Sequence, residues 1–233
     1  MKRVIEPEWL DDLPPDDPGA VGSRQDLRRL NSLMGHVTSL RQLLQAAERS
    51  QPPRRMIELG AGDGTLMLRL ARQLAPKWPG VQVVLVDGKH AVAVETRAGF
   101  QDLGWSVEIV TADVFDWLRQ PATEPADAMI ANLFLHHFSS PQLSELLHLA
   151  ADRTRVFVAC EPWRSQFALA FSRMLGLIGC NAVTRHDAVV SVRAGFADQE
   201  LSSLWPARPQ WQLRERTAGL FTHAFMAERS QAG

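Results

Sequence analysis

Apolar runs and amphipathic stretches follow one another along most of this chain. Five compact apolar runs predict buried strands, at residues 54–59, 81–87, 105–112, 126–132 and 154–160. Three- and four-residue spacing of apolar positions predicts helices between them, at 65–76, 89–103 and 140–153. Strands that alternate with helices in this way are typical of an α/β fold with a mostly parallel sheet. Two alternating runs at 211–217 and 220–227 predict a closing hairpin.

The segment before the first strand has a different pattern. Residues 6–22 are rich in Pro, Asp and Gly, which predicts a loop or an extended arm. Apolar positions from Ser23 to Arg49 recur at helical spacing, which predicts two helices that are broken near Gly35. These helices would either form a lid over a ligand or only cover the core. We expect an arm and helical cap over residues 1–50 and one ligand-binding domain over 51–233.

The most informative stretch is MIELGAGDGT, at residues 56–65. It predicts a buried strand, a tight turn and the start of a helix that Asp63 or Thr65 can cap. Gly60, Gly62 and Gly64 allow positive φ and a close approach of the backbone to a ligand. We therefore predict a site for a nucleotide-sized ligand at the carboxyl edge of the sheet.

The glycine spacing distinguishes between nucleotide ligands. The third glycine comes one residue earlier than in the dinucleotide fingerprint, which disfavours an NAD-dependent oxidoreductase. The run E-L-G-x-G-x-G resembles the first motif of class I S-adenosylmethionine (SAM) methyltransferases. The resemblance implies a Rossmann-like sheet of seven strands, mostly parallel with a C-terminal antiparallel hairpin, plus the N-terminal helical cap. It also implies that Gly60, Ala61 and Gly62 wrap the methionine part of SAM, and that Glu58 attracts its ammonium group.

Further candidate cofactor residues follow the next two strands. Asp87 ends the second strand, where a carboxylate can accept hydrogen bonds from both ribose hydroxyls, and Gly88 follows it. The alternative role of Asp87 is to cap the next helix. Asp113 and Val114 resemble the acidic–apolar step of the family, which implies a bond to the adenine amine and a contact with the ring. Asp116 is an alternative to Asp113.

The fourth strand leads into N-L-F-L-H-H-F, at residues 132–138. A similar run occurs in ubiquinone- and menaquinone-type methyltransferases, which implies that Asn132 and Leu133 contact the cofactor. It departs from the N/D-P-P-Y/F motif of amino-group methyltransferases that act on nucleic acids and glutamine. His136 and His137 are candidate acid–base groups. Alternatively, one caps the following helix and the other packs beneath the loop.

A third candidate base lies in T-R-H-D-A-V, at residues 184–189. His186 is adjacent to Asp187, so a carboxylate could hold the imidazole. The segment resembles small methyltransferases that are encoded with type III polyketide synthases. Before it, Ser165 to Leu177 predicts a helix that is apolar nearly all round. That helix is a candidate wall of a hydrophobic substrate pocket, a homodimer face or a helix packed on the sheet.

Composition narrows the class of protein further. The net charge is −1, so we expect no nucleic-acid partner. Neither Cys160 nor Cys180 lies in a metal-ligand spacing, and we expect no metal. The start of the chain lacks an apolar signal core, and the run from Phe167 to Cys180 is too short to span a bilayer. We therefore expect a cytoplasmic protein without integral membrane association.

Together these features predict a SAM-dependent methyltransferase that releases S-adenosylhomocysteine. We expect its acceptor to be an oxygen of a small, hydrophobic, hydroxylated aromatic or polyketide-type molecule. Two alternatives stay open: a carbon methyltransferase acting on a quinol or polyketide, and a non-catalytic SAM-binding partner subunit.

Overall fold

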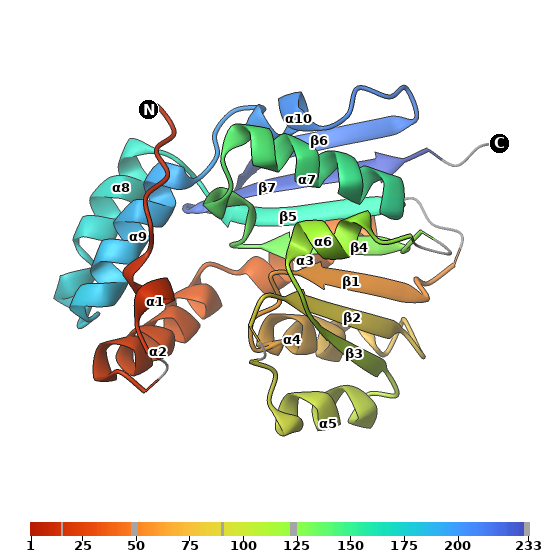
Figure 1. The fold of residues 1–233 in the computed structure, drawn as a ribbon, viewed down its shortest axis with the longest axis horizontal. Helices are drawn as coiled ribbons and strands as arrows, with labels where there is room; N and C mark the ends of the chain where they lie inside the picture. Colours follow the sequence, from red (N-terminus) through yellow and green to blue (C-terminus); the bar gives the residue numbers. More distant parts are fainter. Residues whose placement is uncertain (15, 48–50, 90, 122–124, 231–233) are drawn as a thin grey trace.

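A computed structural model of the chain describes residues 1–14, 16–47, 51–89, 91–121 and 125–230. Its centre is a seven-stranded sheet in the order β3-β2-β1-β4-β5-β7-β6 (Figure 1). The strands are β1 (Arg55–Leu59), β2 (Gln82–Asp87), β3 (Ser106–Thr111), β4 (Ala128–Asn132), β5 (Val156–Pro162), β6 (Trp211–Ala218) and β7 (Thr222–Arg229). Strands β1 to β5 are parallel, whereas β7 runs antiparallel to β5 and β6. The predicted sheet, including its closing hairpin, is confirmed.

Helices cover both faces of the sheet because alternate strand residues point to opposite sides. Ile57 and Leu59 pack with α6 (Val114–Arg119), α7 (Ser140–Arg153) and α10 (Glu200–Leu204). Met56 packs on the other face with α3 (His36–Ala46), α4 (Thr65–Leu74) and α5 (Val94–Asp102). Strand order reverses between β1 and β4, and at such a switch point the carboxyl edge of a sheet opens a ligand crevice.

The remaining helices gather beyond that carboxyl edge (Figure 1). They are α1 (Trp9–Asp12), α2 (Pro18–Leu33), α8 (Gln166–Arg173), η2 (Leu175–Ile178) and α9 (Ala182–Ala194), and α9 contacts each of the other four. A short 3₁₀ turn, η1 (Leu135–His137), follows β4 and also contacts α9. None of the helices within the described ranges is long and apolar enough to cross a membrane.

The predicted helix break near Gly35 is confirmed, because Gly35 has a φ of 69° between α2 and α3. Arg49, the predicted end of that segment, lies outside the described residues. The prediction of a loop over residues 6–22 was wrong in part, because α1 and α2 both begin within it. Asp17 caps α2 by accepting hydrogen bonds from the backbone nitrogens of Gly19 and Ala20.

Other boundaries differ from the prediction for similar local reasons. The helix predicted from residue 89 begins only at Val94. Asp113 caps α6, a helix that the apolar pattern did not reveal because it is only 6 residues long. The apolar helix predicted over 165–177 ends at Arg173, and a 3₁₀ turn then continues to Ile178. The segment with mixed polarity after Asn181 is α9, capped by the Asn181 side chain.

Candidate active site

The glycine loop joins β1 to α4 at the strand-order reversal. Gly60, Gly62 and Gly64 have φ values of 67°, 54° and 72°. A Cβ added at Gly60 would lie 2.1 Å from the Phe134 ring, so a side chain at that position is excluded. A Cβ at Gly62 would meet no chain atom within 4 Å. The loop therefore packs against Phe134 at Gly60 and leaves space for a ligand at Gly62.

Asp87 ties this loop to the end of β2. Its Oδ2 accepts a hydrogen bond of 2.8 Å from the Gly62 nitrogen, and its Oδ1 accepts one of 2.8 Å from the Lys89 nitrogen. Gly88 lies between them, and a Cβ there would meet no chain atom within 4 Å. Carboxylate oxygens have further lone pairs, so these bonds leave acceptor capacity for a ribose hydroxyl.

Glu58 lies beneath the loop as a buried carboxyl group. It is 2% exposed, and its Oε2 has no hydrogen-bond partner in the part of the chain that the structure describes. Burial raises its pKa well above the usual value, and the nearby charges of Asp63 and Asp87 raise it further. A buried acceptor without a donor is costly for the folded chain, and a cationic ligand would relieve that cost.

After β3, Asp113 caps α6 and Val114 packs in the core. Asp113 Oδ1 accepts bonds from the nitrogens of Phe115 and Asp116, at 2.8 and 3.1 Å. Asp113 stays exposed, whereas Val114 is buried in the core. Their proposed contacts with adenine stay a prediction.

Asn132 and Leu133 form the corresponding edge position of β4. Leu133 has a φ of 50°, a strained value for a branched apolar side chain. Its nitrogen donates a hydrogen bond of 2.9 Å to the Cys160 carbonyl, which fixes the turn. Asn132 Oδ1 is buried, and the Asn132 side chain interacts with His36, where it opposes the lowering of the His36 pKa by burial. The strained turn thus holds this amide next to the glycine loop.

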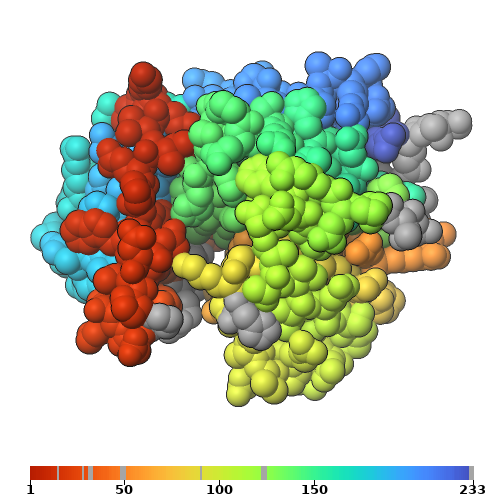
Figure 2. Space-filling model, in the orientation of Figure 1, coloured from red at the N-terminus to blue at the C-terminus, as the bar shows by residue number. Residues whose placement is uncertain are grey.

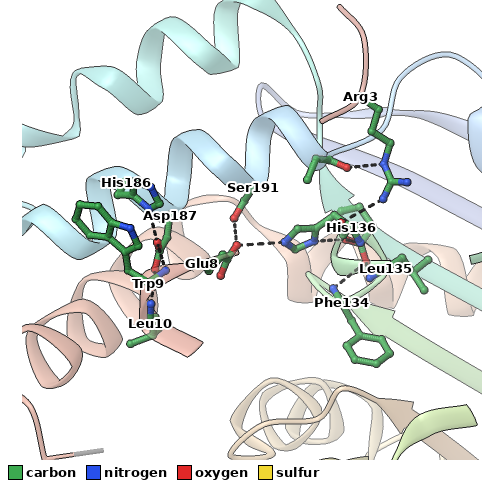
Figure 3. Close-up of polar contacts among 12 residues, drawn as sticks. Arg3, Glu8, Trp9, Leu10, Phe134, Leu135, His136, His186, Asp187 and Ser191 are labelled. Atoms are coloured by element: carbon green, nitrogen blue, oxygen red, sulfur yellow. Dashed lines mark hydrogen bonds and ion pairs between the residues drawn. The ribbon is translucent and has the colours of Figure 1, made fainter. Parts of the chain in front are cut away.

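His136 is clamped between two carboxylates (Figure 3). Its Nδ1 lies 2.8 Å from Oε2 of Glu161, which ends β5 and is fully buried. Its Nε2 lies 3.5 Å from Oε1 of Glu8 in the N-terminal arm. Burial alone would lower the pKa of this histidine, but the two carboxylates raise it to about 9. Nδ1 is therefore hydrogen-bonded to Glu161 and Nε2 faces Glu8, and the raised pKa argues against a simple role for His136 as a proton acceptor.

His137 presents the other imidazole of the pair. Its side chain is exposed, and its ring centroid lies 4.2 Å from that of His136. Partial desolvation lowers the pKa of His137, and the positive charge of His136 lowers it further. Its ring is reachable from solvent. A capping role for either histidine is not seen, since Ser139 and Gln142 form the capping box of α7.

His186 lies apart from this pair, on α9 and on the far side of Glu8 in Figure 3. Its Nδ1 is 2.9 Å from Asp187 Oδ1, as the sequence suggested. Asp187 also accepts bonds from the nitrogens of Trp9 and Leu10, and the Trp9 ring stacks on His186 at 3.9 Å. The pair thus holds the N-terminal arm in place, and its catalytic role stays a prediction.

The N-terminal arm crosses the carboxyl edge of the sheet on the side of His136 and His137. Arg3 donates hydrogen bonds to the carbonyls of Ala194, His136 and Phe138, while Lys89 pairs with Asp11 at 3.2 Å. In Figure 2 the red N-terminal segment accordingly meets the yellow segment that follows β2. The arm therefore connects the cofactor side of the edge with the histidine side.

Sequence reasoning did not assign site roles to Glu8, His36 and Glu161. Glu161 ends a strand, like Glu58 and Asp87, and that position was a usable signal. His36 Nε2 lies 3.0 Å from Thr222 Oγ1 at the start of β7, and burial lowers its pKa to about 4. Neither Glu8 nor His36 stands near a recognisable motif, so only the fold brings them to the site.

Part of the sequence is similar to known proteins. Residues 56–155 match a family described as methyltransferase domain. Trans-aconitate 2-methyltransferase of Mycobacterium tuberculosis is 33% identical over 95 residues, which are 40% of this chain and 30% of that protein. The chain therefore matches only about 30% of the length of its curated relatives.

Solved structures extend the likeness to nearly the whole chain. Mitomycin 7-O-methyltransferase has a TM-score of 0.59 at 18% identity, covering 95% of this chain and 60% of that one. A plantazolicin methyltransferase in complex with a substrate analogue and S-adenosylhomocysteine has a TM-score of 0.59 at 14% identity, covering 91% and 95%. An O-methyltransferase family protein from Burkholderia thailandensis has a TM-score of 0.57 at 18% identity, covering 91% and 59%. Residues 56–155 are therefore similar to a methyltransferase domain, and the chain has the fold of class I SAM-dependent methyltransferases.

Proposed function

We propose that this protein is a SAM-dependent methyltransferase that methylates an oxygen of a small, hydrophobic, hydroxylated aromatic or polyketide-type molecule. The observation that carries the proposal is the division of the carboxyl edge into two halves. Glu58, the glycine loop and Asp87 line the half formed by β1 and β2. The histidine pair and Glu161 line the half formed by β4 and β5.

The first half fits a cationic nucleoside. The unpartnered oxygen of Glu58 and the open space at Gly62 suit an ammonium group and its carbon chain. Asp87 supplies acceptors for ribose, and it lies near enough to Gly62 to share one ligand with the loop. The sulfonium of SAM supplies an activated methyl group. The acceptor oxygen would bond to that carbon as the carbon–sulfur bond breaks, and sulfur would keep the electron pair.

The protein's task is then to align the acceptor and to deal with its proton. In this proposal His136 and His137 are the groups nearest to the hydroxyl proton of the acceptor. The arm covers this side, and excluding water would favour a reaction in which opposite charges cancel.

The pairing of Arg3 and Arg164 favours a neutral methyl acceptor over a multiply charged one. The Arg3 guanidinium is occupied by three backbone carbonyls, and Arg164 is occupied by Glu200 and the Gly195 carbonyl. Neither cation is free to bind a carboxylate. One structural relative is named as a 7-O-methyltransferase, which agrees with oxygen as the receiving atom.

Transfer of a labelled methyl group from SAM to a panel of alkylphenols and resorcinols tests this proposal. We expect a labelled ether, and NMR of the added methyl separates it from the ring-methylated product of a carbon methyltransferase. Cofactor binding without turnover on any acceptor would favour the alternative of a non-catalytic partner subunit. Full turnover after separate His→Ala changes at positions 136, 137 and 186 would overturn the assignment of a histidine base.

A further inference from the structure

Three side chains from two distant parts of the chain lie close together beside the half of the carboxyl edge formed by β4 and β5. Glu8 comes from the N-terminal arm, and His136 and His137 come from the turn after β4. Each offers one ligand atom, and these atoms all lie within 4.8 Å of one another. Figure 3 shows the Glu8 carboxylate turned toward the His136 ring.

The spacing of the first two ligand atoms is informative. His136 Nε2 and Glu8 Oε1 are 3.5 Å apart, which is longer than the usual N–H···O hydrogen bond. Two ligands of one tetrahedral ion, each bound at about 2.0–2.1 Å, lie about 3.3 Å apart. The separation is thus closer to that of two ligands sharing an ion.

Additional hydrogen bonds fix the orientation of the His136 and Glu8 side chains. Nδ1 of His136 faces Glu161 at 2.8 Å, and metal-binding histidines usually donate this other N–H to a carboxylate or carbonyl. The Ser191 hydroxyl donates a hydrogen bond to Glu8 Oε1. Arg3 holds the turn itself through the His136 carbonyl at 3.1 Å. His136 and Glu8 are therefore each oriented by a contact from a different element, β5 for His136 and α9 for Glu8.

We propose that Glu8, His136 and His137 bind a divalent transition-metal ion, with zinc as the best chemical match, and leave a coordination position open. Two imidazoles and one carboxylate are a ligand set typical of catalytic zinc. His137 is exposed, so the open position would face the acceptor side and solvent.

The use of this ion rests on the proposed function. The acceptor oxygen would take the open position, and its proton would pass to solvent when the oxygen coordinates. The same oxygen then forms the bond to the methyl carbon while the carbon–sulfur bond breaks. The two histidines would act as ligands in this scheme, not as separate bases. Spacing in the sequence did not predict the site because Glu8 lies far from the histidine pair.

Cobalt titration of the chelator-treated protein, with the chain of residues 1–233, tests the site directly. We expect one equivalent of Co²⁺ to give saturable visible absorption bands, and Zn²⁺ to abolish them. Glu8→Gln and His137→Asn should each weaken Co²⁺ binding about tenfold or more. His148→Asn is the matched control, because His148 is exposed on α7 outside the cluster.

Absence of a saturable spectrum, or unchanged binding in both Glu8→Gln and His137→Asn, would overturn the site. Loss of binding in His148→Asn would equally overturn it, because a surface histidine would then be the ligand. Circular dichroism of each variant establishes that the fold is intact. S-adenosylhomocysteine affinity, measured on the same samples, separates this proposal from the proposed function: intact cofactor binding with no metal binding rejects only the metal site.

Discussion

The backbone nitrogen of Gly62 donates a hydrogen bond of 2.8 Å to Oδ2 of Asp87. The bond is possible because β1 and β2 pair in parallel with Leu59 opposite Val86, so the glycine loop begins beside Asp87. The two motifs that suggested a cofactor are therefore one structural unit, in which the ribose-binding candidate also shapes the loop.

Replacing Asp87 should weaken cofactor binding. We expect Asp87→Ala to reduce the affinity for S-adenosylhomocysteine by about 10- to 100-fold, because a hydrogen bond to a charged group contributes about 1.5–3 kcal/mol. Asp87→Asn keeps an oxygen that can accept from Gly62 and should lose less. Calorimetry measures both, with Asp102→Ala at the exposed end of α5 as control. Equal affinity in Asp87→Ala and the wild type would contradict this role.

Cofactor binding should release a proton from Glu58. The pKa of this carboxyl group is raised by burial and by Asp63 and Asp87, so the group retains its proton above pH 4.5 in the free protein. An ammonium group nearby favours the charged form and lowers that pKa, so the proton leaves on binding. Calorimetry in buffers with different ionisation enthalpies counts the protons released. Glu58→Gln should bind without release, whereas equal release in this variant would point to another group.

Releasing the N-terminal arm from α9 should weaken binding of the methyl acceptor and leave cofactor binding unchanged. Asp187→Ala removes the acceptor of the Trp9 and Leu10 nitrogens and leaves two donors unpaired, at about 1–3 kcal/mol each. We expect faster chymotryptic cleavage at Trp9, a higher KM for the acceptor and an unchanged Kd for S-adenosylhomocysteine. Asp152→Ala, which removes an exposed ion pair with Arg208, is the control. Unchanged cleavage would show that Asp187 does not hold the arm.

The apolar surface of α8 and η2 bears on the alternative that this segment is a homodimer face. Leu177 is 79% exposed, and its large apolar neighbours on these elements are exposed too, namely Phe167, Phe171, Met174 and Ile178. An apolar patch of this kind is typical of an interaction site. If it joins two copies, Leu177→Glu should turn dimers into monomers in analytical ultracentrifugation, whereas Val94→Glu, also 79% exposed, should not. A wild-type monomer at all concentrations would reject the dimer.

The local spacing of apolar residues and glycines made most of the fold predictable from the sequence. The apolar runs located all seven strands, and Gly35 marked the break between α2 and α3. The short helices α1 and α6 were missed because each depends on one carboxylate that accepts from the backbone at its start. For α1 that carboxylate is Asp187, which is distant in sequence.

The site was predictable to the extent that its residues end strands. Glu58, Asp87 and Asn132 lie at one edge because parallel strands bring their carboxyl ends together. The partners of His136 were not predictable, since Glu161 lies near the end of β5 and Glu8 lies on the N-terminal arm. His186 shared the residue type of His136 but faces Trp9, which no local pattern indicates.

Calorimetric titration with S-adenosylhomocysteine, beside NAD, tests the central claim most directly. Wild-type protein should bind the former with a Kd in the micromolar range, about −8 kcal/mol, and should not bind NAD. Gly62→Ala should weaken binding, whereas Gly80→Ala should not, although both positions have positive φ and open space around the added carbon. Binding of NAD alone, or of neither compound, would contradict the assignment of this edge as a SAM site.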